Sequence, residues 1–216
     1  MSPIALAGAL AVAAVSGDTT RSGCTYSGAR AWSDQTRYLV ADCPLQLPSP
    51  SGAFSLRIGA DGRLSVWSKS GKALKSTGVR KIEPPAMVTW SPASDAFVVD
   101  DGEGSGLSSK LVLFRIGKDG VASDLSVNRQ AVSWFRSVTR CPRHAADPNV
   151  WGVGWSPRGE KLFIFIQPTV NEPCGDPSSY AGMVVKTSTG KVLKTLTMKQ
   201  TKQSFGSLVP KETLAP

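Results

Sequence analysis

The tripeptide Trp-Ser-Pro occurs twice in similar surroundings, and this repeat restricts the possible folds more than any other feature of the sequence. It begins at Trp90 and again at Trp155, and a weaker echo, Trp-Ser, begins at Trp32, so that the three tryptophans stand 58 and 65 residues apart. Each copy ends an apolar run and is followed by a short polar turn and a second apolar run. Two short β-forming runs joined by a polar turn are typical of a β-hairpin. The sequence therefore predicts a hairpin that repeats along the chain.

Each repeat also contains a second pair of short apolar runs. Residues 54–58 and 64–67 flank Asp61-Gly62, residues 111–116 lead into a turn at 117–120, and residues 182–186 precede a turn at 188–191. Four short strands are the content of one propeller blade, and blades stack because a single blade cannot bury both of its faces. We therefore predict a mainly β fold: a propeller-like stack of about three four-stranded antiparallel blades, open or partial. The units lie near residues 31–72, 87–116 and 151–197, with Trp90 and Trp155 between blades.

Trp-Ser-Pro followed by a polar turn and an apolar strand resembles the core motif of TolB-like and WD40-like bacterial β-propeller repeats. The resemblance covers residues 87–116 and 153–191 well and residues 31–72 loosely. The usual Asp-Gly after Ser-Pro is replaced by Ala93-Ser94-Asp95 in one copy and by Arg158-Gly159 in the other. Three units are fewer than the roughly four to eight blades of a closed propeller. The chain also resembles small secreted bacterial proteins with the same motif, and the resemblance implies interaction scaffolding.

One segment departs from the β pattern. Between residues 123 and 140, Val127, Ala131, Trp134/Phe135 and Val138 recur at spacings of three and four, which predicts an amphipathic helix near 124–140. Asp124 is placed to cap its start and Pro142 to stop it. We expect this single helix to pack on the sheet between the second and third units. The polar segment 199–216 is predicted to be a flexible tail, which leaves residues 17–198 as one domain.

The first residues resemble an export signal. Residues 3–15 are uncharged and apolar, too short to span a bilayer but of the length of a signal-peptide h-region. Ala14-Val15-Ser16 fits a small-x-small cleavage site, although the basic n-region is truncated. A buried helix is the alternative, but the segment has no polar face to present to water. We predict a signal peptide at 1–16 and a periplasmic or secreted protein.

The chain has four cysteines: Cys24, Cys43, Cys141 and Cys174. An even number in an exported protein is normally a disulfide set, and three pairings are possible. Proximity in the sequence favours Cys24 with Cys43 and Cys141 with Cys174. A metal site is disfavoured because no Cys-x-x-Cys occurs and the only histidine, His144, has no partner at ligand spacing.

The net charge is +9, from 25 basic and 16 acidic residues, and residues 1–17 carry none of these charges. Outside the cytoplasmic membrane, the available polyanions are lipid headgroups, wall polymers and acidic proteins. Ordinary solvated strand faces account for most of the lysines, such as those from Lys69 to Lys81 and from Lys186 to Lys199. We expect a protein partner of acidic character, with a cell-wall polymer or a second copy of the chain as alternatives. We expect no nucleic acid and no stable membrane span after removal of the leader.

The acidic segment 100–106 is the best candidate for chemistry. Asp100, Asp101 and Glu103 could bind Ca²⁺, but the Asp-x-Asp-x-Asp spacing of a calcium loop is missing, so a turn or partner-facing loop is favoured. A glycosidase-like carboxylate pair is disfavoured because neighbours along a strand point to opposite faces. His144 has no Gly-x-Ser-x-Gly motif to act with, and no phosphate or dinucleotide fingerprint occurs. We therefore assign no catalytic residue and no cofactor.

Several residues are candidates for binding a partner. Trp67 and Trp151 fall outside the register of the repeat, so they are either core residues, which we favour, or exposed anchors. The loop 168–180 contains three prolines and Cys174, and such a pre-ordered loop loses little entropy on binding. The candidate partner-binding residues are Trp67, Trp151, Asp101, Glu103, Arg143 and Asp176.

Together, these features predict an exported, non-enzymatic binding protein with a propeller-like scaffold for a macromolecular partner. One alternative is a periplasmic inhibitor or immunity-type protein directed against a toxin or lytic enzyme. Another is a hydrolase or lyase that acts on an anionic cell-wall polymer. A fold alone never fixes a function. These three classes are distinguished by the partner that each predicts and by whether the protein converts it chemically.

Overall fold

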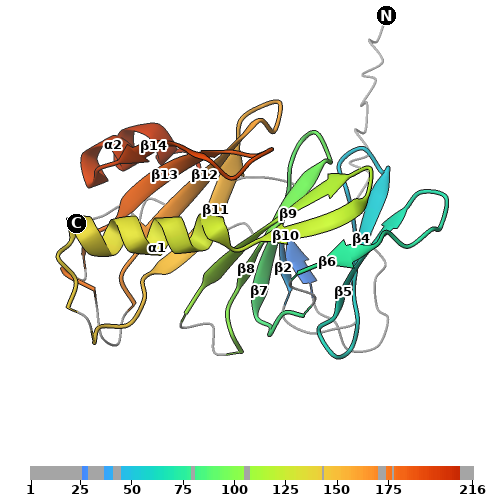
Figure 1. Ribbon diagram of the computed structural model, residues 1–216, viewed down its shortest axis with the longest axis horizontal. Coiled ribbons are helices and arrows are strands. Elements are labelled where there is room, and N and C mark those ends of the chain that lie inside the picture. The colour runs from blue at the N-terminus through green and yellow to red at the C-terminus, as the bar shows by residue number, and fades with distance from the viewer. Residues whose placement is uncertain are drawn as a thin grey trace, which may run out of the picture.

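The computed structural model describes residues 26–28, 37–40, 45–78, 81–104, 108–142, 144–169, 174–176 and 178–209. This part of the chain is mainly β, as predicted, and contains two helices and three sheets. The sheets follow one another along the long axis of the molecule (Figure 1). The molecule is therefore a stack of sheets with helices at one end.

The three sheets differ in size. The first has the order β3-β4-β5, the third β11-β12-β13-β14, and the second β1-β2-β7-β8-β9-β10-β6, with β6 parallel to β10. Their bounds are β1 Tyr26–Gly28, β2 Arg37–Val40, β3 Leu45–Pro48, β4 Phe54–Ile58, β5 Leu64–Ser68, β6 Ser76–Thr77, β7 Ala86–Trp90, β8 Ala96–Asp101, β9 Lys110–Gly117, β10 Gly120–Asp124, β11 Asn149–Trp155, β12 Lys161–Gln167, β13 Ala181–Lys186 and β14 Val192–Leu196.

The third predicted unit forms a sheet of four antiparallel strands, β11 to β14, whereas the four antiparallel strands of the second unit, β7 to β10, belong to a seven-stranded sheet that also contains β1, β2 and β6. They extend from Ala86 to Asp124 and from Asn149 to Leu196, beyond the predicted 87–116 because the turn at 117–120 leads into a further strand. In the first unit the hairpin of β4 and β5 is confirmed, but the sheet has three strands. The echo at Trp32 lies outside the described residues.

Two apolar layers hold the stack together, one on each face of the second sheet. Because side chains alternate along a strand, Phe97 and Val99 point to the first sheet, whereas Ala96 and Val98 point to the third. Trp90 is fully buried in the first layer and Trp155 nearly so in the second. The prediction that these two tryptophans pack between sheets is confirmed.

The two Trp-Ser-Pro turns have the same hydrogen bonds. The amide that opens the second strand donates to the serine hydroxyl in both copies, from Ala96 to Ser91 at 3.2 Å and from Lys161 to Ser156 at 3.0 Å. Three residues after each serine the chain takes a left-handed conformation, at Ser94 with φ 61° and at Gly159 with φ 74°. The two sequences that replace Asp-Gly therefore form the same type of turn. At its left-handed position, glycine is less strained than serine.

The predicted helix is α1, Ser126–Val138. Its residues Val127, Ala131 and Phe135 are buried between the second and third sheets, whereas Val138 is exposed, contrary to the periodicity. Asp124 lies one residue before the N-cap residue Leu125, and its carboxylate accepts the backbone N–H of Ser126, the first residue of the helix. The helix ends before Pro142.

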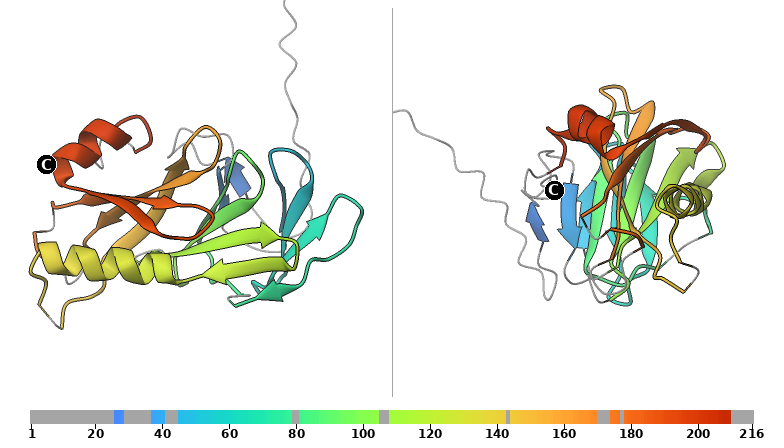
Figure 2. Two further views of the ribbon diagram at one scale, coloured as in Figure 1. Left: turned by 45° about the horizontal axis from the view of Figure 1, so that its top comes forward. Right: turned by 90° about the vertical axis from the view of Figure 1, so that its left-hand side faces the viewer.

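The prediction of a flexible tail from residue 199 is wrong for its first part, and the prediction of a single helix fails with it. Helix α2, Met198–Phe205, follows β14 and lies on the face of the third sheet opposite to α1 (Figure 2). Thr197 and Gln200 form a reciprocal capping box that fixes its start, and Phe205 is buried. Residues 210–216 lie outside the described part.

One disulfide, Cys141–Cys174, joins the segment after α1 to the loop before β13, as proximity predicted. Cys24, Cys43 and the predicted signal peptide lie outside the described residues. Neither helix of the described part is long and apolar enough to cross a membrane.

Candidate functional site

The two tryptophans outside the repeat register do not share a surface. Trp67 lies half-buried on the first sheet, where the Arg57 guanidinium stacks at 4.1 Å from its ring centroid. Trp151 lies half-buried on the third sheet and stacks on Phe165 at a centroid distance of 5.9 Å. Trp67 therefore packs against a cationic side chain and Trp151 against another aromatic ring.

The acidic segment divides between two faces, as strand alternation requires. Asp100 is 4% exposed, and its carboxylate accepts the buried N–H of Gly152 at 2.9 Å, which joins the second sheet to the third. Asp101 points the other way and accepts the N–H groups of Glu83 and Glu103, both at 3.1 Å. Asp100 is thus committed to the sheet interface rather than to a shared calcium site.

Asp101 and Glu103 line a small cavity of about 240 Å³ together with Glu83, Lys81 and Lys110. Burial raises the pKa of Asp101 above its ordinary value, and this effect outweighs the two N–H donors. Across the described residues, no group of three or more His, Cys, Asp or Glu side chains is arranged to hold a metal ion. This cavity is a mixed-charge depression.

Asp176 lies two residues after Cys174, and His144 three residues after Cys141, on the two segments that the disulfide joins. His144 and Asp176 are both exposed, and the Asp176 carboxylate accepts the N–H and hydroxyl of Ser178, which lowers its pKa. Arg143 lies outside the described residues. Of the five candidates that the structure describes, Asp101 and Glu103 line one cavity, whereas Trp67 and Trp151 lie on different sheets.

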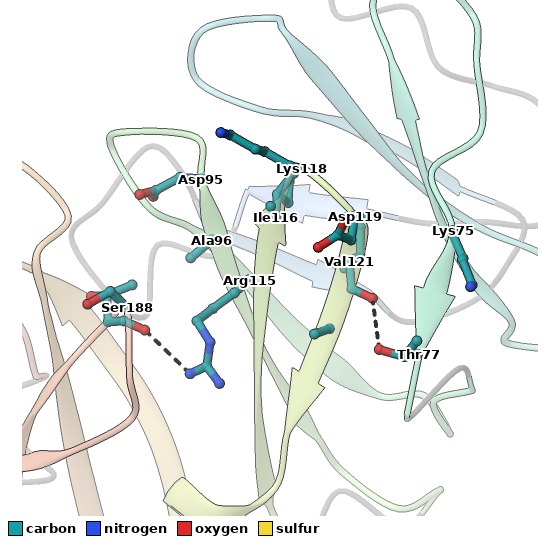
Figure 3. A pocket seen from close by; sticks show the side chains of 14 residues that line it. Lys75, Thr77, Asp95, Ala96, Arg115, Ile116, Lys118, Asp119, Val121 and Ser188 are labelled. Atoms are coloured by element: carbon teal, nitrogen blue, oxygen red, sulfur yellow. Dashed lines mark hydrogen bonds between the residues drawn. The ribbon is translucent and has the colours of Figure 1, made fainter.

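A larger groove, of about 470 Å³, opens between the second and third sheets at the end where the β9–β10 turn lies (Figure 3). Its rim consists of that turn, the segment around β6 and the β13–β14 turn with Thr187 and Ser188. The charged side chains that line it are Lys75, Asp95, Arg115, Lys118 and Asp119. This groove is about twice as large as the cavity at Asp101, and its lining also carries both signs of charge.

Gly120 fixes the rim of this groove. Its φ is +125°, and a Cβ there would overlap the carbonyl oxygen of Lys75. The close approach lets the N–H of Val121 donate to that oxygen at 2.7 Å, which attaches the segment of Lys75 to the second sheet. Only glycine satisfies both conditions.

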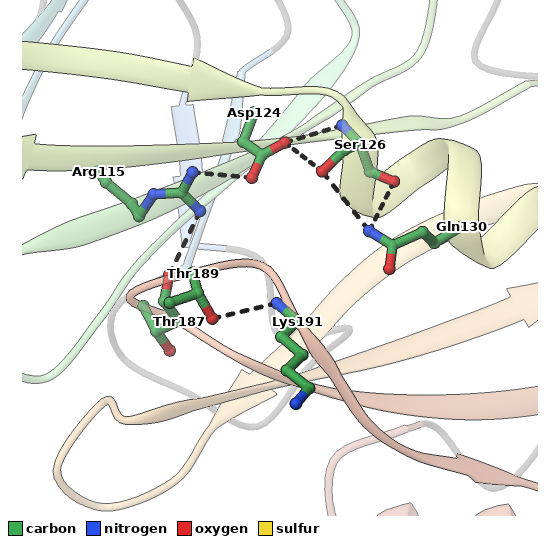
Figure 4. A network of polar contacts seen from close by, with 7 residues as sticks. All are labelled: Arg115, Asp124, Ser126, Gln130, Thr187, Thr189 and Lys191. Carbon is green, nitrogen blue, oxygen red and sulfur yellow. Dashed lines mark hydrogen bonds and ion pairs between the residues drawn. The ribbon is translucent and has the colours of Figure 1, made fainter.

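Arg115 is held in place by a polar network (Figure 4). Its guanidinium donates to Asp124 at 2.8 Å and to the carbonyl oxygen of Thr187 at 3.4 Å, so that one side chain links β9, the end of β10 and the β13–β14 turn. Asp124 also accepts the N–H of Ser126 at 2.8 Å. Burial by itself raises the pKa of Asp124, but the bonds from Ser126 and Arg115 together outweigh it and lower the pKa below its ordinary value.

We expect Asp124→Asn to lower the free energy of unfolding by about 1 kcal/mol at pH 7, because it replaces a charge-assisted bond between partly buried groups. Since the pKa of Asp124 is lower in the folded state, this contribution is present above about pH 4 and disappears as the pH falls through the folded-state pKa. Urea unfolding of both proteins from pH 7 to pH 3 measures it. Asp147→Asn is the control, because Asp147 pairs with Arg136 but is 71% exposed, and its effect should stay below about 0.5 kcal/mol. A difference between wild type and Asp124→Asn that does not shrink in acid would contradict the assignment.

The groove residues Lys75, Arg115, Lys118 and Ser188 were not among the predicted site residues. The sequence predicts the turns at 117–120 and 188–191, but it does not show that the turn after β9 faces the turn after β13. That proximity arises from the stacking of the second sheet on the third. Lys118 and Asp119 in the β9–β10 turn were the clearest signal in the sequence.

No protein-family model matches the chain, and no curated protein matches it either.

Proposed function

We propose that the chain is an exported, non-enzymatic binding protein whose stacked sheets form a propeller-like scaffold for a protein partner. Three features support this proposal. The sheets stack face to face through apolar layers, as blades do. The disulfide is typical of proteins that fold in an oxidising compartment. The third feature, the groove, carries the proposal.

The groove combines a fixed charge with adaptable ones. Arg115 is already ordered by Asp124 and Thr187, so little entropy is lost when a partner contacts it. Lys75 and Lys118 are exposed, and neither forms an ion pair with another described residue. Such lysines attract an acidic group, while Asp95 and Asp119 restrict which ligands fit. This arrangement suits an acidic segment of a protein that also donates hydrogen bonds.

The double variant Lys75→Glu/Lys118→Glu tests the proposal. We expect it to weaken binding of the partner at least tenfold, because both reversals replace attraction by repulsion. The measurement is affinity capture from an envelope extract of the source organism on the oxidised full chain, followed by titration of the retained protein at two salt concentrations. Binding should weaken as the salt concentration rises.

Lys72→Glu is the matched control, because Lys72 is exposed in the turn after β5 and does not line the groove. It should leave binding within about twofold of wild type. Retention of wall polymer alone, or equal losses in the two variants, would contradict the proposal. Chemical conversion of the retained material would favour the hydrolase or lyase hypothesis.

A further inference from the structure

In the described part of the chain, α2 covers one portion of the outer face of the third sheet, which points away from the second sheet. There α2 lies against β13, and Phe205 and Thr201 pack so closely on Gly182 that a Cβ would lie 2.8 Å from each of them. Phe205 also contacts Phe163 of β12, with ring centroids 5.4 Å apart. The chain thus shows how this face accepts an amphipathic helix.

The same face also carries three lysines beside Phe163 and Val184, two apolar side chains that the cluster around Phe205 covers in part. Strand alternation places Lys161 with Phe163 on β12, Val184 with Lys186 on β13, and Lys194 on β14, because Leu162, Met183 and Val185 between them are buried in the inner layer. Phe163 and Val184 are half-buried, and the three lysines are exposed. We call these five residues the lysine face.

The register brings like charges together on this face. Lys161 lies directly opposite Lys186 on the neighbouring strand, and Lys194 lies opposite Val184. Like charges in directly opposed positions destabilise a sheet. No described acidic side chain forms an ion pair with any of the three lysines. A ligand with negative charges would remove the repulsion.

We propose that the lysine face is a docking site for an amphipathic helix of a partner protein, with acidic residues along the borders of its apolar stripe. The apolar stripe covers Phe163 and Val184, and the acidic residues meet Lys161, Lys186 and Lys194. The helix lies beside α2, about 8–10 Å from it, and about three turns are enough to cross the four strands. None of these five residues lines the groove, so the lysine face is a second contact of the proposed binding protein.

Two observations favour a helix on the face over a strand added to the edge. The ladder between β13 and β14 is interrupted by a bulge at Val184 and Val185, and Lys194 lies on the terminal strand β14. Bulges and lysines are the features by which edge strands resist pairing with another strand. In contrast, α2 already demonstrates helix packing on the face itself.

The test uses a synthetic peptide of about 18 residues with leucines at helical spacing, glutamates beside them and a fluorescent label. We expect it to bind the oxidised full chain, and Lys186→Glu to weaken binding at least tenfold. Lys186→Glu should at the same time leave the melting temperature equal or higher, because it replaces repulsion of Lys161 by attraction. Lys72→Glu and the groove variant Lys75→Glu/Lys118→Glu should each change the affinity less than about twofold.

Each of three other results would overturn the inference: no binding of the peptide, an equal loss with Lys72→Glu, or equal binding of a peptide with lysine in place of glutamate. Inorganic polyphosphate and vesicles of anionic phospholipid serve as competing probes. If either binds as tightly as the peptide and depends on Lys186 to the same extent, the face recognises negative charge alone, and the helix assignment is wrong. The variant Lys75→Glu/Lys118→Glu tests the groove and Lys186→Glu tests the lysine face. A failure of the helix-docking inference can therefore be distinguished from a failure of the proposed function.

Discussion

Removal of the disulfide by Cys141→Ala/Cys174→Ala is expected to lower the free energy of unfolding by about 4 kcal/mol. The bond links residues separated by 33 positions, and closing a loop of that length removes roughly 3–4 kcal/mol of chain entropy from the unfolded state. The loop contains β11 and β12, and one end of it follows α1. Cys174 is fully buried in the layer between the second and third sheets, so its loss also reduces packing.

Urea unfolding followed by tryptophan fluorescence measures this effect, because Trp155 lies in the same buried layer. An unchanged slope with denaturant would show that the midpoint shift reports stability. The matched control is Cys24→Ala/Cys43→Ala, which removes the other predicted pair. A loss of less than about 1 kcal/mol in the Cys141/Cys174 variant would mean that the bond contributes little to the stack.

The β-hairpins could be predicted from the sequence because their determinants are local. Trp-Ser-Pro fixes a turn through the proline, the serine hydroxyl and one left-handed residue, and the flanking runs have strand periodicity. Helix α1 was predictable for the same reason, since Val127, Ala131 and Phe135 repeat at helical spacing. Each of these features is complete within about twenty residues.

Features that depend on contacts between distant segments could not be predicted. Helix α2 is short and mostly polar, so its only local signal is the capping box of Thr197 and Gln200, and its stability depends on the contact of Phe205 with Gly182 of the third sheet. The lysines from Lys186 to Lys199 looked like an ordinary solvated strand, because the sequence does not show that Lys161 lies opposite Lys186. The groove depends likewise on how two sheets stack.

Asp100 illustrates that a local pattern does not show which residues have a structural role. Its place among acidic residues and glycines suggested a cation ligand, but a buried carboxylate that accepts a buried N–H across two sheets is a structural contact. We expect Asp100→Ala to lower the free energy of unfolding by about 3 kcal/mol, because the N–H of Gly152 is then left unsatisfied between the sheets. Thermal and urea unfolding measure the loss.

Asp100→Asn separates the hydrogen bond from the charge. Its side-chain oxygen can still accept the N–H of Gly152, so we expect a loss of only about 1 kcal/mol. An apolar side chain at position 100 would not restore the stability lost in Asp100→Ala, because it offers no hydrogen-bond acceptor to the N–H of Gly152. Hydrogen exchange at Gly152 gives an independent readout: the amide should exchange faster in Asp100→Ala and close to the wild-type rate in Asp100→Asn. If both variants lose stability equally while that amide stays protected, the second and third sheets are held by their apolar layer alone, and Asp100 has another role.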